Sequence, residues 1–460
     1  MTRLARDFTR CVLGWSADAP ELMARCRLLL LDGLAVAAAG ATEPGPTHMA
    51  DLSATQYGEG VATLIRRDRT ATPLAAARIN GMAMHVLDFE PMWNPPNHAV
   101  STLLPALLAL AEQLECDTGE PHGDALLRAF AKGIEAQGRL RLSSGQLEPA
   151  QLSLHPPGVV GPLAAALACA DLLGLDDEAA TAALGIAASR SGGLLANIGS
   201  QTKALHCGDA AANGLEAALL AQRGFTANDD ALGGPRGWGR AYFGERFDET
   251  PLLAPIGAGR ALSPGPAWKL FPSQYATHFA ITAALDARAQ LDATEAAAIE
   301  RIELHVPAMP YIDRPRPQNG LDGKFSWQYT AVVALLDGRV DFASFADERR
   351  FAADVEGLLP RVTLHADPAI PGAFDRLHVD LALLLKSGRR VEAHCAAPLG
   401  GWSRPVEARA IEAKARSLLE AAFGPQRADE AMRAVAGLPA RGRVREVMRT
   451  LRQTPRRTLQ

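Results

Sequence analysis

Three short stretches of the chain carry side chains that can bind an anion or move a proton. Imidazole groups titrate near neutrality and can act as general acids or bases, and an ammonium group neutralises a bound carboxylate or phosphate. The side chains are Asp88 and His98 in HVLDFEPMWNPPNHAV, His155 in LHPPGVVG, and Lys203 and His206 in GSQTKALHCG. If folding gathers them, they form a positively biased site for an anion.

The first two stretches also have structural interpretations. Prolines at 91, 95 and 96 restrict the backbone around Asp88 and His98. The stretch is therefore either a loop that aims a carboxylate and an imidazole at one place or an ordinary connection between helices. His155 stands before two prolines at the start of an apolar helix, where it is either a site residue or a packed capping residue.

The third stretch is the most informative. Lys203 and His206 follow Gln201 and precede a helix that we expect to open near residue 208. Cations and backbone N–H groups at a helix N-terminus favour a bound carboxylate or phosphate, and the alternative is a capped helix with an exposed lysine. Two further polar stretches open apolar helices and are weak evidence alone: KLFPSQYATH, with Lys269 and Gln274, and GKFSWQYTAVVALL, with Tyr329.

The sequence also excludes several classes of protein. Its histidines show no HxH or HxxxH spacing and it has no P-loop or GxGxxG motif, so we expect neither a metal nor a nucleotide cofactor. A net charge of -4 gives no reason to expect nucleic acid. The apolar runs are shorter than the ~20 residues that span a membrane. Six separated cysteines without CxxC predict reduced thiols and a cytoplasmic location.

The elements that must position these groups are mainly helical. At 460 residues with 48% hydrophobic content, the chain is long enough for two domains. Apolar residues at helical spacing predict the helices 22–39, 71–86, 101–114, 123–142, 159–173, 177–189 and 208–223. This alanine-rich part predicts an all-helical domain over residues 1–265.

After residue 265 the pattern changes. Alternating apolar residues predict strands at 299–306 and 361–366 and a hairpin over 375–394, with helices at 277–290 and 325–336. Beyond residue 405 the chain reads as helix again. The fold class expected is thus mainly α with a smaller α+β domain: a helical domain of residues 1–265, completed by 400–460, and an inserted lid of residues 266–399.

Several of these spans together resemble a known family. In order and spacing over nearly the whole chain, LLLLDGLAVAAAGA, AARINGMAMHVLDFE, HPPGVVGPLAAALACADLLGL, GSQTKALHCGDAA and FPSQYATH resemble the MmgE/PrpD family. That family includes 2-methylcitrate dehydratases, cis-aconitate decarboxylases and iminodisuccinate epimerases. The resemblance implies a large helical domain, an inserted α+β lid and a homodimer.

Within that family the chain is most similar to the decarboxylase branch, through EAQGRL, YIDRPRP, SWQY and GGWSRP. Carried over residue by residue, the resemblance implies the active-site set Asp88, His98, His155, Lys203 and Tyr329. Three positions depart from the branch. Met92 stands where it carries a threonine, Gln274 stands where it carries a histidine, and Glu90 replaces the second aspartate of its DFDD pattern. These departures leave the substrate and the reaction open.

The resemblance implies a small di- or tricarboxylate as substrate. We expect His98 and His155 to transfer a proton, Asp88 to orient one of them, and Tyr329 to hydrogen-bond a substrate carboxylate. The expected substrate-binding residues are Lys203, His206, Gln274, Met92 and Gln201. The reaction expected first is cofactor-independent decarboxylation of a cis-aconitate-like acid. The alternatives are dehydration or hydration of a citrate-type hydroxy acid, epimerisation of a dicarboxylate, and a non-catalytic carboxylate-binding homologue.

Overall fold

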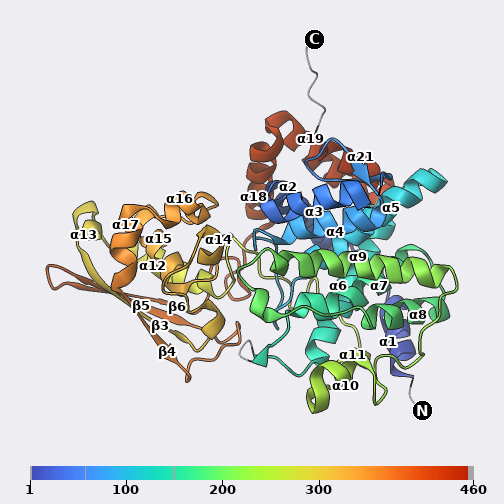
Figure 1. The fold of residues 1–460 in the computed structure, drawn as a ribbon, viewed down its shortest axis with the longest axis horizontal. Helices are drawn as coiled ribbons and strands as arrows, with labels where there is room; N and C mark the ends of the chain where they lie inside the picture. Colours follow the sequence, from blue (N-terminus) through green and yellow to red (C-terminus); the bar gives the residue numbers. More distant parts are fainter. Residues whose placement is uncertain (1–2, 57, 149–150, 454–460) are drawn as a thin grey trace, which may run out of the picture.

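The helices predicted before residue 265 pack into one helical body, on the right in Figure 1. The computed structural model describes residues 3–56, 58–148 and 151–453. The body contains α1 (Leu4–Leu13), α2 (Pro20–Gly40), α3 (Pro44–Gln56), α4 (Pro73–His85), α5 (Val100–Thr118), α6 (Gly123–Ser143), α7 (Pro156–Leu172), α8 (Asp177–Ala188), α9 (Thr202–Gln222), α10 (Trp238–Phe243) and α11 (Thr250–Leu253). A short pair, β1 (Ala62–Thr63) and β2 (Thr70–Ala71), is antiparallel.

Small residues let the central helices of the body approach closely. A Cβ on Gly81 of α4 would lie 2.9 Å from the Cα of Gly208 on α9, and a Cβ on Gly214 would lie 2.4 Å from that of Ala165 on α7. Any larger side chain would force these helices apart. The alanine- and glycine-rich composition is therefore a requirement of helix packing around the site.

The expected start of α9 was wrong. The helix begins at Thr202, so Lys203 and His206 lie in its first turns and not before it. Polar side chains usually mark the edge of a buried helix, but Lys203 is only 7% exposed and is satisfied by a buried partner. This polar side chain is part of the site and does not mark the end of a helix.

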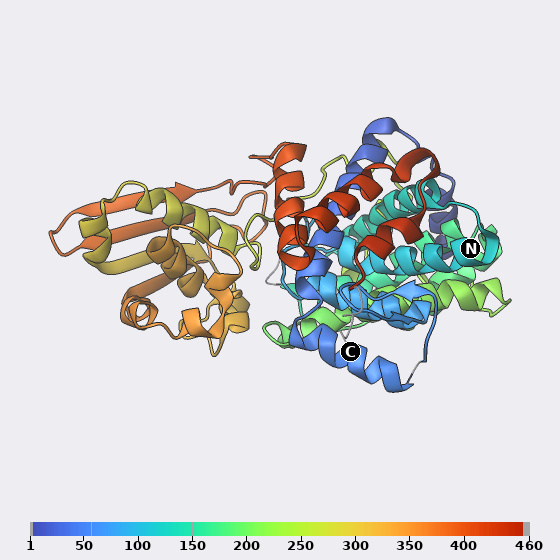
Figure 2. The ribbon, with the colours of Figure 1, turned by 90° about the horizontal axis from the view of Figure 1, so that it is seen from above.

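The C-terminal helices return to the body after the lid. They are α18 (Ala408–Phe423), α19 (Pro425–Ala436), α20 (Leu438–Arg441) and α21 (Val444–Thr450). In both views α18 stands at the side of the body that faces the lid (Figures 1 and 2). Lys414 on α18 forms a buried ion pair with Asp32 on α2 at 2.9 Å and donates to the carbonyl oxygen of Phe89 at 2.8 Å.

The lid is built on a four-stranded mixed sheet of order β4-β3-β5-β6. Strands β3 (Ile299–Pro307) and β4 (Val362–Asp367) are parallel, and β5 (Val379–Leu385) is antiparallel to both β3 and β6 (Arg390–Cys395). The helices of the lid are α12 (Thr277–Arg288), α13 (Ala293–Ala297), α14 (Gly320–Gly323), α15 (Trp327–Asp337), α16 (Asp347–Arg350) and α17 (Ala353–Leu358). Leu304 and Leu381 are buried in the same apolar core as α12 and α15, which lie on one side of the sheet (Figure 1).

The mainly α fold with a smaller α+β part is confirmed. The described residues form two hydrophobic cores, one in the body and one in the lid. The chain passes from one to the other between two consecutive residues, Ala267 of the lid core and Trp268 of the body core. The domain limits 1–265, 266–399 and 400–460 stay a prediction, and residues 454–460 lie outside the described part of the chain. In that described part, no helix has both the length and the apolarity that a membrane crossing requires.

Candidate active site

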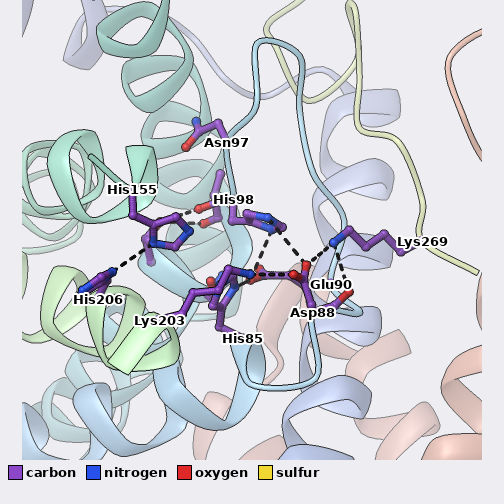
Figure 3. Close-up of polar contacts among 12 residues, drawn as sticks. His85, Asp88, Glu90, Asn97, His98, His155, Lys203, His206 and Lys269 are labelled. Carbon is purple, nitrogen blue, oxygen red and sulfur yellow. Dashed lines mark hydrogen bonds and ion pairs between the residues drawn. The ribbon is translucent and has the colours of Figure 1, made fainter. Parts of the chain in front are cut away.

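Asp88 lies at the centre of the site, in the loop that follows α4. Its backbone φ is 51°, in the left-handed region that residues other than glycine rarely adopt. Its carboxylate accepts a hydrogen bond from Lys203 Nζ at 2.6 Å and pairs with Lys269, whose Nζ also donates to the Asp88 carbonyl oxygen at 3.0 Å. The two lysines reach the carboxylate from opposite sides (Figure 3).

The charges of this triad do not cancel. Burial opposes ionisation of Asp88, but the ammonium groups of Lys203 and Lys269 outweigh it and hold the pKa of Asp88 well below its usual value. Burial lowers the pKa of Lys269, and Asp88 partly restores it. Two buried ammonium groups share one carboxylate, so the site keeps a positive bias that an anion can satisfy.

Behind Asp88 lies a second group of polar side chains. His85 Nδ1 is 2.6 Å from Oε1 of Glu90, and the other Glu90 oxygen accepts from the backbone N–H of Ser101 at 2.8 Å. His98 lies between the two acids: its Nδ1 is 3.6 Å from Glu90 and its Nε2 is 3.9 Å from Asp88. Burial raises the pKa of Glu90 to about 8, so this carboxyl is protonated at neutral pH.

The histidines of the site are neutral at neutral pH. Burial, reinforced by the positive charge of Lys269, lowers the pKa of His98 well below its usual value. Burial and the charge of Lys203 do the same for His155. His155 occupies the N-cap position of α7 without a capping hydrogen bond from its side chain, and its Nδ1 lies 3.3 Å from Nδ1 of the half-buried His206 on α9. His206 therefore contacts the site through His155, at the end of the row of side chains in Figure 3.

Body and lid together line one pocket of about 520 Å³, a volume that includes its open mouth. Of the residues predicted from the sequence, the pocket gathers Asp88, Met92, His98, His155, Lys203 and Gln274. The lid side adds Lys269, Tyr275, Tyr311, Phe325 and Phe374.

Two residues that depart from the decarboxylase branch contribute to this wall. Gln274 accepts from the backbone N–H of Ala276 at 2.6 Å and donates its amide to the Tyr311 hydroxyl at 3.1 Å. Met92 is 2% exposed, and its backbone exchanges two hydrogen bonds with Ala267, which ties the Asp88 loop to the lid. Burial raises the pKa of Tyr311, so its hydroxyl keeps its proton.

Three predicted residues do not line the pocket, and of these His206 still contacts a lining residue, His155. Tyr329 is fully buried in the lid core, where its hydroxyl donates to the carbonyl oxygen of Ser344 at 2.5 Å. Ser326 caps α15, so Tyr329 lies in the first turn with its ring against the lid interior. Tyr275 and Tyr311 are the tyrosines that line the pocket. The structure therefore does not bring Tyr329 to the pocket. Gln201 is exposed at the start of α9, outside the pocket lining.

The structure adds residues that the sequence interpretation did not select. Lys269 stands in a polar stretch that is weak evidence alone, although it contacts Asp88 directly. His85 drew no notice, because a single histidine at the end of an apolar helix is usually a packing residue. The sequence feature that could have indicated its role is the separation of only five positions between His85 and Glu90.

His85, Glu90 and His98 offer ligand atoms within 4.8 Å of one another, a spacing that could hold a metal ion. The surroundings disfavour a dication, however. Lys269 is paired with Asp88, which lies 3.9 Å from His98, and the positive charge of Lys269 already lowers the pKa of His98. A metal ion there would meet this ammonium group at short range in a medium of low dielectric constant.

A helical body, a mixed α+β lid and a positively biased pocket between their cores define a two-part protein whose junction suits a small anion. The chain belongs to the MmgE/PrpD family: residues 6–250 match the MmgE/PrpD N-terminal domain, and residues 271–438 match the MmgE/PrpD C-terminal domain.

Curated relatives agree with this assignment. The chain is 33% identical over 409 residues to cis-aconitate decarboxylase of Mus musculus, which covers 86% of this chain and 82% of the mouse protein. It is 33% identical over 406 residues to cis-aconitate decarboxylase of Homo sapiens, covering 86% and 83% of the two chains. Cis-aconitate decarboxylase of Aspergillus terreus is 30% identical over 214 residues, or 46% of this chain and 44% of the fungal protein.

Proposed function

We propose that this protein is a lyase that decarboxylates a small tricarboxylic acid of the cis-aconitate type. Family membership and the names of its relatives support the lyase class and a tricarboxylate substrate. The observation that carries the proposal is the Lys203–Asp88–Lys269 triad, which lies beside two neutral histidines in a pocket lined by both body and lid.

The pocket suits the charge changes of this reaction. Loss of CO2 breaks a carbon–carbon bond and leaves its electron pair on the carbon framework, next to the remaining carboxylates. Lys203 and Lys269 stabilise that negative charge, and fixed charges in a buried site are the largest catalytic term in many enzymes. A proton then adds to carbon, so each turnover consumes one proton from solution.

His98 and His155 are the proposed proton donors. They must be protonated to act in this way, and a bound polyanionic substrate favours their protonation. Both are neutral in the free protein because they are buried near lysines. A bound tricarboxylate reverses the local charge, raises both pKa values and favours the imidazolium form. Asp88 lies 3.9 Å from His98 Nε2 and orients that ring. Tyr311, with its hydroxyl held by Gln274, donates to a substrate carboxylate.

Met92 and Gln274 favour a second candidate, a dehydratase or hydratase of a citrate-type hydroxy acid. A methionine and an amide in this wall remove one hydroxyl and one imidazole relative to the decarboxylase branch. Such a pocket would orient a different carboxylate pattern while keeping the lysine triad. Epimerisation of a dicarboxylate and carboxylate binding without catalysis are the remaining alternatives.

Three further features belong to the same proposal. The reaction proceeds without a metal or an organic cofactor, supported by the lysine charge beside His85, Glu90 and His98. The protein is a homodimer, as the family resemblance implies. It functions in the cytoplasm, supported by its six free cysteines, which suit a reducing compartment.

The deciding experiment incubates the purified protein with cis-aconitate, trans-aconitate, citrate and 2-methylcitrate while CO2 and alkene absorbance are followed, with and without EDTA. We expect CO2 from an aconitate isomer at a rate that EDTA does not change. Alkene without CO2 supports the dehydratase, and silence toward all four acids supports a binding role. His98→Asn is the negative control, because it keeps the size of the side chain and removes the proposed proton donor.

A further inference from the structure

Four histidines and one aspartate gather on the face of the lid sheet that points away from its helices. The strand register places His365 of β4 opposite His305 of β3, His305 opposite Asp380 of β5, and Asp380 opposite His394 of β6. These residues form one row across all four strands in their spatial order. His378 lies two positions before Asp380 and therefore on the same face.

The side chains of this row make contacts in two groups, one of His378, Asp380 and His394 and one of His305 and His365. His394 Nδ1 is 2.6 Å from one oxygen of Asp380, and His378 Nε2 is 3.9 Å from the other. The rings of His378 and His394 are 5.5 Å apart, and those of His305 and His365 stack at 4.5 Å. Asp380 is thus flanked by imidazoles along its own strand and on both neighbouring strands.

The neighbouring charges on this face are paired differently. Arg390 binds Glu303 at 3.1 Å and Glu392 at 2.8 Å, so arginine satisfies the acids of the adjacent row. Asp380 is paired with histidines instead. Its side chain is 49% exposed, and those of His378 and His394 are 33% and 58% exposed. The three side chains can therefore turn toward a common ligand without disturbing the core.

We propose that His378, Asp380 and His394 form a surface binding site for a divalent transition-metal ion, with His305 as the neighbouring fourth ligand. Positions i and i+2 of one strand and the residue opposite them on the next strand lie side by side on one face of a sheet. Imidazole nitrogen with one carboxylate is a ligand set that suits zinc, nickel or copper, whereas calcium and magnesium prefer oxygen alone. Water completes the coordination at an exposed site.

This site is separate from the pocket. Its ligands lie on the outer face of the sheet, whereas the pocket is lined from the lid by Lys269, Gln274, Tyr275, Tyr311, Phe325 and Phe374. The proposal therefore concerns an additional binding function and is independent of the proposed reaction.

The test is calorimetric titration of Zn²⁺ into the full chain carrying no polyhistidine tag. We expect one ion per chain, and an affinity that falls at least about tenfold in His378→Ala, Asp380→Ala and His394→Ala, since even the partners of metal ligands contribute that much. His48→Ala is the matched control, because His48 is an exposed histidine on α3 of the body and should bind zinc as the unmodified protein does.

A fourth variant separates this site from the buried cluster. Glu90→Gln changes the His85–Glu90–His98 group, and it should leave zinc affinity unchanged. Failure of the unmodified protein to bind zinc overturns the proposal. So does loss of binding in Glu90→Gln with retention in Asp380→Ala, which would assign the ion to the pocket. Circular dichroism checks that each variant is folded.

Discussion

The side-chain amide of Gln274 donates to the Tyr311 hydroxyl at 3.1 Å, and that hydroxyl donates in turn to Met309 Sδ at 3.9 Å. Gln274 thereby holds the Tyr311 hydroxyl at the lid side of the pocket, where a substrate carboxylate would be a stronger acceptor than the Met309 thioether. A histidine at position 274 would add a titratable group there instead. This pair is where the wall of this protein differs most clearly from the decarboxylase branch.

Tyr311→Phe should lower kcat/KM about 10- to 100-fold, because a hydrogen bond to a charged group contributes about 1.5–3 kcal/mol. Tyr329→Phe is the matched control, since that phenol is buried in the lid core on Ser344. It should lower the melting temperature and leave kcat/KM nearly unchanged. Steady-state kinetics with the best acid from the substrate panel measure kcat/KM for the two variants. Equal kinetic losses in both variants would contradict the assignment of Tyr311.

Met92→Thr combined with Gln274→His should raise activity on cis-aconitate at least about tenfold if these two positions select the substrate, since a positioned acid–base group contributes at least that much. The double variant restores the hydroxyl and the imidazole of the decarboxylase branch. Rates of CO2 release from cis-aconitate are compared with those on the acid that the unmodified protein prefers. An unchanged ratio would mean that the two positions do not encode substrate choice.

Lys203→Ala should raise KM and lower kcat together, with a loss in kcat/KM of about 10²- to 10³-fold. The ammonium group contacts Asp88 at 2.6 Å and lines the pocket, so its loss removes charge from both ground-state binding and the reaction. Lys132→Ala is the control, because Lys132 pairs with Asp171 away from the pocket. Kinetics of Lys203→Ala that match those of the control would remove Lys203 from the anion site.

Binding of a tricarboxylate should be accompanied by proton uptake near pH 7. The lowered pKa values of His98 and His155 keep both neutral in the free protein, and a nearby polyanion raises them. Calorimetry in buffers with different ionisation enthalpies measures the number of protons bound. His98→Asn should reduce that number. Zero uptake in the unmodified protein would rule out imidazolium formation on binding.

Glu90→Gln should flatten the dependence of stability on pH. The folded-state pKa of Glu90 is about 8, against 4.5 for an unperturbed glutamate, so the folded protein holds this proton more tightly than the unfolded chain. The stabilisation is complete below pH 4.5 and is lost as the pH rises to about 8, by up to several kcal/mol. Urea unfolding at pH 5 and pH 8.5 measures it.

The glutamine keeps an acceptor for the Ser101 N–H and cannot ionise, so its advantage over the unmodified protein should grow from pH 5 to pH 8.5. Glu216→Gln is the control, because Glu216 pairs with Arg190 at the surface. It should follow the unmodified protein across this range. A constant difference between Glu90→Gln and the unmodified protein at the two pH values would contradict the raised pKa.

The fold could be predicted because its elements are long and differ in pattern. Apolar helices such as α7 and alternating strands such as β3 leave clear signals in the sequence. The start of α9 could not be placed, because the polarity of Lys203 is satisfied inside the protein and resembles the polarity of a loop. A local sequence pattern indicates the average environment of a residue type and does not identify the residue that it contacts in the fold.

The candidate site was predictable only where motifs were local. Asp88, His98, His155 and Lys203 stand in distinctive short stretches, and the structure gathers them in one pocket. Lys269 meets Asp88 across 181 positions, and no local pattern marks that contact. Tyr311 and Tyr329 both stand in stretches that resemble the decarboxylase branch. Only packing in the lid decides that Tyr329 turns inward to Ser344 while Tyr311 reaches the pocket.

The hydrogen bond from Lys414 to the Phe89 carbonyl oxygen means that the site can be completed only late in synthesis of the chain. The two residues are 325 positions apart, and Phe89 lies between the two acids of the Asp88 loop. At ~5–20 residues per second, a ribosome needs about 15–65 s to synthesise the chain between them. A nascent chain halted before α18 therefore carries the pocket residues of both body and lid but lacks Lys414, which fixes the loop of Asp88 and Glu90. The geometry of the site is thus among the last features completed during translation.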